Sequence, residues 1–312
     1  MAKKSKQQAL VNAGQTVSEA FEAILKHNFT DLAQWEGAAR SWNDTEGVHQ
    51  MRVALRRMRS VVRTFRPAVP RSATDRWVEE MRWIASQLGP ARDLDVFIAE
   101  GLDTAADKLS LPGQKKLTTL IRRRRQKLYN NVQAMLDSDR YASFKQELGA
   151  WLDAKSWLSA EELQEKNRRW LESKLVPFAR QRLDKQGRKV LETGNNVNQD
   201  SPQALHRLRI ECKKLRYPTE FFSPLFKGMD DFIDHLKGLQ DLLGVIHDVA
   251  VMPHLLDELL ARTKDPQVLQ YAGGLVGWRT RQYHEIKASF DERWKDFAGA
   301  RHPWGEKSAV VH

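Results

Sequence analysis

One stretch of the sequence occurs twice, and this constrains the fold more than any other feature. Residues 49–67, HQMRVALRRMRSVVRTFRP, align without a gap with residues 206–224, HRLRIECKKLRYPTEFFSP, at an offset of 157. A second match follows each copy, because MRWIASQLGPARDLDV (81–96) aligns with LKGLQDLLGVIHDVAV (236–251). Similarity at a fixed offset indicates repeated structural units. We therefore expect an internal duplication whose halves join near residue 155.

The repeated units are expected to be helical. Strand signals are nearly absent, and the Ala, Leu, Glu, Lys, Arg and Gln content favours helix. Gly187 to Pro202 is the clearest loop. Breakers and polar clusters predict helices near residues 14–36, 46–66, 73–100, 113–150, 159–187, 202–226, 228–262 and 265–299. Four helices fall in each half, so we expect an all-α fold of two four-helix units.

The predicted halves are residues 14–155 and 156–300, between a flexible basic tail at 1–13 and a C-terminal tail at 301–312. The chain has 51 Lys and Arg against 40 Asp and Glu, a formal net charge of +11, which suggests a polyanionic partner. A single cysteine excludes an internal disulfide framework. No signal peptide or membrane-spanning run is evident, so we expect a soluble, cytoplasmic protein without membrane contact.

Each repeated helix carries two neighbouring stripes. At 100° per residue, apolar side chains from Met51 to Phe65 share one sector, and basic side chains from His49 to Arg66 share an adjacent sector roughly 100° wide. The second copy keeps both stripes. The apolar stripes predict core positions, and Cys212 is expected there as a core residue rather than a reactive thiol. The basic stripes are left for another role.

The basic stripe of the first copy repels itself. Like charges four residues apart destabilise a helix, yet residues 48–67 contain no acidic side chain. A solvated basic face is the ordinary alternative, but an anion that relieves the repulsion explains the pattern better. Arginine forks grip phosphate oxygens bidentately. Two such stripes related by a pseudo-two-fold axis would line one groove or basic central channel, which suits an extended polyanion.

Two histidines and two aspartates recur at matching positions. His49 and His206 precede the cations by one turn and are expected to contact the anion, with binding strengthened by acid because imidazolium offers a second donor. A structural hydrogen-bonding role is the alternative. Asp93 and Asp248 are interpreted as partners that orient arginines or cap a helix, with a metal ligand or general base as the alternative. We expect no metal and no cofactor.

Further cations could extend the basic wall on the following helices. Arg92, which is matched by His247, is left open. The run Arg122–Arg125 has a solvated face as its alternative. The cations predicted to extend the wall are Arg82, Lys237, Arg122, Arg124, Arg279 and Arg281.

The residues described so far resemble the CHAD family, the conserved histidine α-helical domain. The motifs that carry the resemblance are VHQMRVALRRMRSVVRTF, LGPARDLDVF, LHRLRIECKKLRYPTEFF and LKGLQDLLGVIHDVAV, and the resemblance covers roughly residues 14–300. It implies two four-helix bundles related by pseudo-two-fold symmetry around a basic central cavity that binds inorganic polyphosphate. It also implies association with polyphosphate granules, and a binding domain rather than an enzyme.

The resemblance assigns a primary site residue by residue. The characteristic histidines of the family fall on His49 and His206, and Arg63 extends the first stripe. The basic motif of the family falls on Arg52, Arg56, Arg57, Arg59, Arg209, Lys213, Lys214 and Arg216. Two departures, Pro218 and Ile246-His247, affect the expected local geometry. Many relatives also carry a triphosphate-tunnel metalloenzyme domain with an ExExK strand, and this chain lacks that motif, so we expect no catalytic module.

Two alternatives to a polyphosphate-binding protein remain. A nucleic-acid or general polyanion binder is disfavoured because single-strand binders stack bases on aromatic side chains, and the nearest aromatic residue to the cationic sector is Tyr217. A polyphosphate-processing enzyme would use His49 or His206 with Asp93 or Asp248. No Walker loop, GxGxxG, HExxH or GxSxG motif is present, so we expect no enzyme. The expected partners are polyphosphate and proteins of polyphosphate granules.

Overall fold

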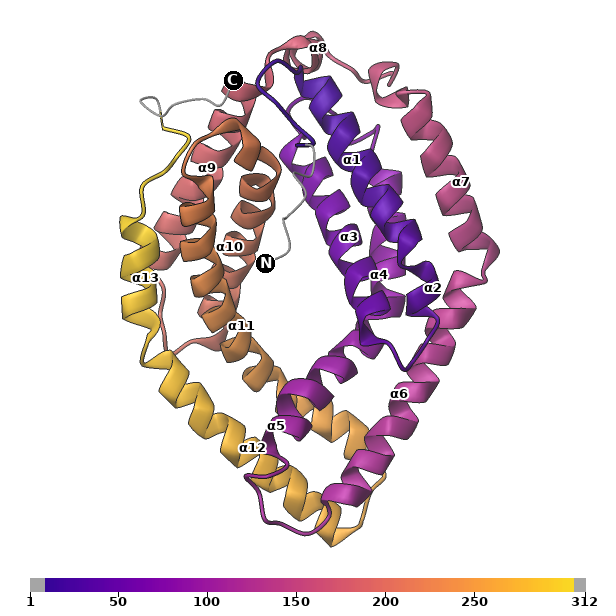
Figure 1. Ribbon diagram of the computed structural model, residues 1–312, viewed down its shortest axis with the longest axis vertical. Coiled ribbons are helices and arrows are strands. Elements are labelled where there is room, and N and C mark those ends of the chain that lie inside the picture. Colours follow the sequence, from indigo (N-terminus) through magenta and orange to yellow (C-terminus); the bar gives the residue numbers. More distant parts are fainter. Residues whose placement is uncertain (1–8, 306–312) are drawn as a thin grey trace, which may run out of the picture.

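The structure is a computed structural model that describes residues 9–305 (Figure 1). Helices make up its regular secondary structure, and β-pairing in this range is confined to one isolated bridge between Thr16 and Lys174. The predicted all-α fold is therefore confirmed. None of the described helices is both long and apolar enough to cross a membrane.

The first predicted half contains a run of helices with one π-helical segment, η1. In chain order its elements are α1 (Val17–Gln34), α2 (Glu36–Ala39), α3 (Thr45–Thr64), α4 (Asp75–Val96), η1 (Phe97–Leu102), α5 (Asp103–Ala105), α6 (Gln114–Leu136) and α7 (Asp139–Asp153).

The second predicted half begins with a short 3₁₀ turn, η2, and contains another, η3. In chain order its elements are η2 (Ser156–Leu158), α8 (Glu165–Glu172), α9 (Leu175–Asn195), α10 (Pro202–Phe222), η3 (Ser223–Leu225), α11 (Met229–Leu260), α12 (Pro266–Lys287) and α13 (Phe290–Gly299).

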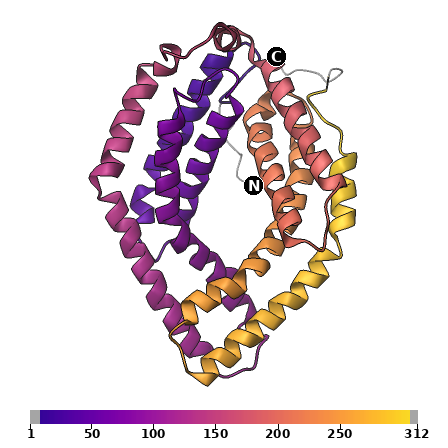
Figure 2. The ribbon, with the colours of Figure 1, turned by 180° about the vertical axis from the view of Figure 1, so that it is seen from behind.

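The helices form two groups that lie side by side. Figure 1 shows α1, α3 and α4 on one side and α9, α10 and α11 on the other. Along the outer edges run α6 with α7 and α12 with α13, and Figure 2 shows the same arrangement from behind. The groups contact each other where α3 meets α10, and α6 meets α12 at the tip of the molecule opposite α8. The helices that carry the repeated motif therefore lie at the centre.

One hydrophobic core joins the two predicted halves. Phe65, at the end of α3, has its ring centroid 5.2 Å from that of Phe178 on α9 and 6.0 Å from that of Phe222 on α10. All three rings are fully buried. Phe65 and Phe222 are equivalent positions of the predicted repeat, and their contact is what a two-fold axis between α3 and α10 would produce. The duplication itself stays an inference from the sequence, as does the central channel.

The stripe pattern explains how α3 and α10 sit. Asp44 caps α3 by accepting a hydrogen bond from the Glu46 backbone, and Ser201 caps α10, which has Pro202 in its first turn. Both apolar stripes are buried, including Met51 on α3 and Cys212 on α10. The assignment of Cys212 to the core is confirmed.

Several predicted helix boundaries are wrong. The helix expected over 113–150 breaks after Leu136, because Ser138 caps α7 by accepting from the Tyr141 backbone. The helix expected over 159–187 is two helices, since the backbone at Ser173 is extended and accepts a hydrogen bond from Val17 of α1. The residues after 187, expected as loop, continue α9 to Asn195.

Gly194 lies in the part of α9 that is expected from the sequence to be a loop. Gly194 lies against the ring of Trp294, and a Cβ atom added at Gly194 would overlap that ring. Glycine here serves close helix packing and does not mark a turn. The sequence shows the glycine, which is a typical helix breaker, but it does not show that Trp294 packs against it.

The tails are packed where the structure describes them. Residues 1–8 and 306–312 of the predicted tails lie outside the described residues. Val11 is fully buried, and Trp304 is 2% exposed with its ring centroid 4.8 Å from that of Phe232. Residue 11 of the tail predicted to be flexible, and residue 304 of the predicted C-terminal tail, are therefore packed against the protein. The division into 14–155 and 156–300 stays a prediction.

Candidate functional site: a basic cluster between α3 and α10

Four cations from the two central helices lie close together. Burial lowers the pKa of Lys213 on α10 to about 7. The positive charges of Arg209, Arg56 and Arg52 act in the same direction, and the carboxylate of Asp248 opposes them. Because such interactions are short-ranged in salt solution, both helices must point these side chains into one region. We call Arg52, Arg56, Arg209 and Lys213 the central basic cluster.

The central basic cluster contains buried donors without acceptors. Among the described residues, the Nε atoms of Arg56 and Arg209 are inaccessible and have no hydrogen-bond partner. A buried donor that has lost water and gained no acceptor costs about 1–3 kcal/mol. An oxyanion between α3 and α10 would bind the terminal guanidinium nitrogens of these arginines and offset the mutual repulsion.

The histidines border this cluster and differ in their neighbours. Burial lowers the pKa of His49, and the positive charge of Arg92 adds to the effect. His206 instead lies beside His247, with the two Nδ1 atoms 3.2 Å apart, so one ring donates and the other accepts. Burial and the nearby cation Arg209 lower the pKa of His247 to about 4. Both rings are therefore held mostly neutral near pH 7.

Asp93 and Asp248 each lie near cations of the central basic cluster. Asp93 Oδ1 is 3.9 Å from a terminal nitrogen of Arg52, whose other terminal nitrogen donates to the Ala85 carbonyl at 3.2 Å. Burial raises the pKa of Asp248, against the opposing charges of Arg209 and Lys213. Asp93 therefore lies within ion-pair distance of Arg52, and its role of orienting that arginine stays a prediction. Among residues 9–305 no group of three or more His, Cys, Asp or Glu side chains is arranged to hold a metal ion.

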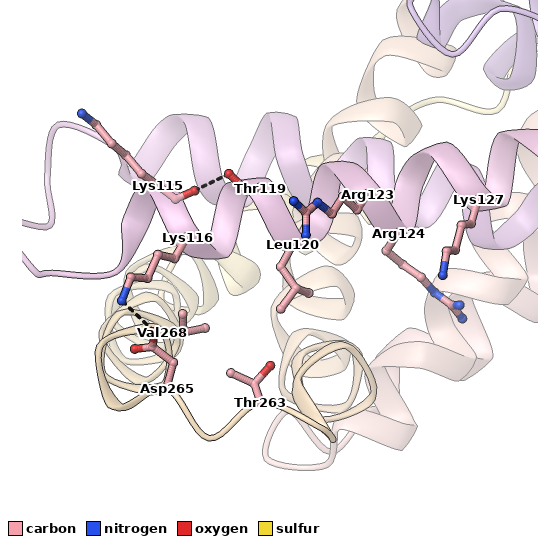
Figure 3. Close-up of a pocket in the computed structure, with 10 residues that line it drawn as sticks. All are labelled: Lys115, Lys116, Thr119, Leu120, Arg123, Arg124, Lys127, Thr263, Asp265 and Val268. Atoms are coloured by element: carbon pink, nitrogen blue, oxygen red, sulfur yellow. Dashed lines mark hydrogen bonds and ion pairs between the residues drawn. The ribbon is translucent and has the colours of Figure 1, made fainter.

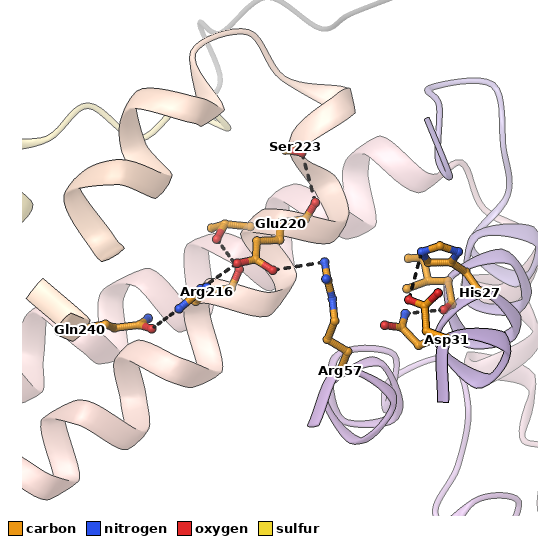
Figure 4. A network of polar contacts seen from close by, with 10 residues as sticks. His27, Asp31, Arg57, Arg216, Glu220, Ser223 and Gln240 are labelled. Atoms are coloured by element: carbon orange, nitrogen blue, oxygen red, sulfur yellow. Dashed lines mark hydrogen bonds and ion pairs between the residues drawn. The ribbon is translucent and has the colours of Figure 1, made fainter. Parts of the chain in front are cut away.

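Three predicted binding residues are already paired with glutamates. Glu220 accepts from Arg216 Nε at 2.7 Å and lies 3.2 Å from a terminal nitrogen of Arg57, so it ties α10 to α3 (Figure 4). Lys214 is bonded to Glu211 at 2.7 Å. The pair of Arg57 with Glu220 stabilises the contact between the helices, whereas the other two pairs lie within α10. A polyanion would have to compete for all three cations.

The basic surface continues along α3 beyond the cluster. Burial lowers the pKa of Arg59, and the charges of Arg82 on α4 and Arg56 reinforce it. Burial also lowers the pKa of Arg63, whose neighbours include Arg182 on α9. Arg82 therefore joins the surface as expected. Arg182, whose own Nε is buried without a partner, was missed because α9 carries no repeated motif that would single it out.

The remaining predicted cations are scattered. Lys237 is exposed and 3.6 Å from Asp234, although its predicted equivalent Arg82 joins the surface. Arg281 is exposed and paired with Glu285 at 2.9 Å. The other cations of this set lie on α12, which carries Arg279, and on α6, which carries Arg122 and Arg124.

Arg279 is 7% exposed and donates to Gln282 at 2.9 Å, close enough to Asp248 to affect the pKa of that carboxyl group. Arg122 and Arg124 are exposed on α6, away from α3 and α10. The expectation that these α6 arginines extend the central wall is therefore wrong, because α6 runs along the outer edge of the molecule.

One arginine of the run 122–125 has a purely structural partner. Arg125 is buried and its Nε lies 2.5 Å from Asp95 Oδ1, while Tyr129 donates to Asp95 Oδ2 at 2.7 Å. This buried group joins α6 to α4. The sequence interpretation did not separate Arg125 from its exposed neighbours, although it is spaced four residues from the buried Ile121 and Tyr129.

Comparisons with known proteins agree on the fold. The family model described as CHAD domain matches residues 23–257. The CHAD domain from the plant Ricinus communis has 27% sequence identity and a TM-score of 0.78, with 96% of each chain covered. PptA from Streptomyces chartreusis has 15% identity and a TM-score of 0.66, covering 90% of this chain and 100% of PptA, and indicates the shared fold alone.

Two curated sequences are also similar. The uncharacterized proteins MT2285 and Rv2226 of two Mycobacterium tuberculosis strains are each 26% identical over 261 residues, which is 81% of this chain. The match covers 48% of each relative, so the chain spans about half the length of the curated relatives it matches.

Proposed function

Because this chain belongs to the CHAD domain family, we propose that it binds inorganic polyphosphate at the central basic cluster. The family model covers both α3 and α10, and the histidines and cations that carry the resemblance lie on these helices. The proposal rests above all on the crowding of Lys213 by arginines from both helices, whose charges add to burial in lowering the pKa of Lys213 to about 7. Such crowding of cations needs a compensating anion.

The cationic row is long enough for several phosphate groups. From Arg52 to Arg63 the row on α3 extends roughly 16 Å, at 1.5 Å per residue. Arginine forks and a lysine ammonium supply many donors for phosphate oxygens. A single small phosphate would use only part of this row, whereas a chain of phosphates would satisfy cations from both helices at once. The affinity should therefore fall steeply with salt, as for other phosphate polymers.

The proposed role is binding without catalysis. His49 and one ring of the His206–His247 pair would donate hydrogen bonds to phosphate, since the other ring of that pair uses its N–H within the pair. The aspartates would orient arginines, so no step requires a bond to break. We place this role in the cytoplasm at polyphosphate granules, with granule proteins as further partners, on the basis of the family resemblance. Polyphosphate recovered after incubation should keep its chain length, and shortened chains would make the protein an enzyme.

A charge-reversal variant tests the site. Arg56→Glu with Lys213→Glu should weaken binding of long-chain polyphosphate by 100-fold or more, because a hydrogen bond to a charged group contributes about 1.5–3 kcal/mol. Binding would be measured by calorimetric titration at several salt concentrations. The matched control is Lys166→Glu with Arg168→Glu on α8, which makes the same charge changes at exposed positions. Retained affinity in a folded variant, as judged by circular dichroism, would refute the site assignment.

A further inference from the structure

A second basic site lies at the tip of the molecule, where α6 meets α12. A pocket of about 610 Å³ opens between the first half of α6 and the segment 263–268 (Figure 3). Its walls include Arg123, Arg124 and Lys127 from α6, with Leu120 and Val268 as apolar lining. Pockets of roughly 300–1,000 Å³ are typical of small-ligand sites.

Three cations of this pocket form no ion pair within the described part of the chain, whereas a fourth is paired. Lys116 is bonded to Asp265 at 2.7 Å, and this bond lowers the pKa of the Asp265 carboxyl group. Among the residues the structure describes, no carboxylate forms an ion pair with Arg123, Arg124 or Lys127. The spacing of Arg123 and Lys127 places like charges four residues apart, which destabilises an isolated helix. The one acidic side chain in the lining is thus already neutralised.

Two helices begin beside the pocket. α6 starts at Gln114 and α12 at Pro266, and the backbones meet so closely that a Cβ atom on Gly113 would overlap the carbonyl of Gln267. Gly113 also has a φ of 97°, which favours glycine. Helix N-termini carry partial positive charge. The Asp265 carboxylate caps α12 by accepting from the Gln267 backbone at 3.0 Å, so the start of α6 is the helix end that adds to the positive potential of the pocket.

The first turn of α6 carries positive side chains at the end of the helix where the helix dipole is also positive. It contains Lys115 and Lys116 and no acidic residue, although acidic side chains are favoured at this position. Both lysines border the pocket. An anion bound there would relieve the unfavourable dipole interaction, the repulsion along α6 and the lack of partners for the arginines together. A ligand of several phosphate units that lies along α6 fits all three conditions, because Lys115 and Arg123 are about 12 Å apart along the helix axis.

We propose that this pocket is a second phosphate site, separate from the central basic cluster, for a condensed phosphate a few units long. Arg123, Arg124 and Lys127 grip the phosphate oxygens, and the start of α6 with Lys115 supports the charge at the other end of the ligand. The same chemistry could come from a free short phosphate or from the end of a long polyphosphate chain. The inference rests on the proposed function only for the chemistry of the ligand, since the two sites share no residue.

Titration with tripolyphosphate tests the pocket directly. The variant Arg123→Gln with Lys127→Gln removes two unpaired cations, and Lys166→Gln with Arg168→Gln is the control with equal net charge at the opposite end of the molecule. Both would be made in the Arg56→Glu/Lys213→Glu background, so that binding at the central basic cluster is suppressed. The pocket variant should lose at least tenfold in tripolyphosphate affinity, and the control less than twofold.

Hydrogen exchange locates the ligand in the unmodified protein. Tripolyphosphate should protect the backbone at the start of α6 and the start of α12. Unchanged exchange there, or equal affinities of the pocket and control variants, would overturn the second site. Neither result bears on the proposed function, which depends on long-chain binding to Arg56 and Lys213.

Long-chain polyphosphate distinguishes the two sources of the ligand. With otherwise unmodified protein, a several-fold loss of long-chain affinity in Arg123→Gln/Lys127→Gln, but not in the control, would show that one chain reaches both sites. A loss confined to tripolyphosphate would assign the pocket to free short phosphates. Either result supports the site.

Discussion

The two central helices carry matching cations but hold them differently. On α3, the residues from Val48 to the end of the helix include no acidic side chain. On α10, Glu211 bonds Lys214 and Glu220 bonds Arg216. Their histidines differ as well, because His49 faces Arg92 whereas His206 pairs with His247. The first helix thus supplies no carboxylate of its own, and those near Arg57 and Arg52 come from other helices, whereas the second helix neutralises part of its charge itself.

The difference also separates the helices by their response to pH. The cations of α3 are arginines, which stay protonated in the accessible pH range. On α10, Lys213 has a pKa of about 7, and that helix's histidine partner His247 has one of about 4. A bound polyanion favours the protonated forms. The comparison therefore assigns the pH-independent part of binding to the arginines of α3, and the pH-dependent part to Lys213 of α10 and the histidines.

The largest expected effect is a difference between Arg56 and Lys213 in how pH changes the loss of polyphosphate affinity when each is replaced. Arg56→Met should reduce polyphosphate affinity by roughly 10- to 100-fold at both pH 6 and pH 8. Lys213→Met should cost as much at pH 6 but about tenfold less at pH 8, where about nine in ten Lys213 side chains in the free protein are neutral. Titrations at constant salt measure both values. An equal pH response of the two variants would abolish the proposed division between the helices.

A second, smaller effect concerns stability without ligand. The pKa of Lys213 is lowered from 10.5 to about 7 on folding, so the unfolded chain binds more protons between these values. The free energy of unfolding therefore rises with pH across this window, and the full cost of a charged Lys213 is present below pH 7.

Replacing Lys213 by methionine removes that cost. Lys213→Met should raise the free energy of unfolding at pH 7 by about 1–3 kcal/mol, and the gain should fade towards pH 10. Denaturant titration at both pH values measures the gain. A variant that is less stable than the original at pH 7 would mean that Lys213 is not strained by its neighbours.

The smallest expected effect concerns Glu220 of α10, which is paired with Arg57 and Arg216. Glu220→Gln weakens the bonds to Arg57 and Arg216, so the melting temperature should fall by a few degrees, from a loss of about 1 kcal/mol. The same change frees two arginines and should raise polyphosphate affinity a few-fold at low salt. Calorimetry measures both changes. If affinity falls with stability, Glu220 organises the site instead of competing with the ligand.

The sequence predicted the stripes because a helix repeats its faces by a simple rule. The spacing of Met51, Leu55 and Met58 places them in the core, and the cations beside them must then lie next to the partner helix. Helical class and the central position of both motifs follow from that rule. The binding roles of His49, Arg52 and the other site residues stay predictions.

Long-range partners could not be read from the sequence. Nothing local indicates that Arg57 meets Glu220, or that Arg125 is buried against Asp95 while its neighbours are exposed. Both depend on how helices far apart in the chain approach. The second phosphate site is hidden for the same reason, since its walls come from α6 and from the start of α12.

The most direct test of the central claim is a competition between long-chain polyphosphate and single-stranded RNA of equal total charge, repeated at several salt concentrations. We expect polyphosphate to displace RNA from the protein and to lose this advantage in Arg56→Glu/Lys213→Glu. The polyphosphate recovered afterwards should have its full chain length. Equal affinity for both polymers, or a preference that survives in the variant, would contradict a selective polyphosphate site between α3 and α10.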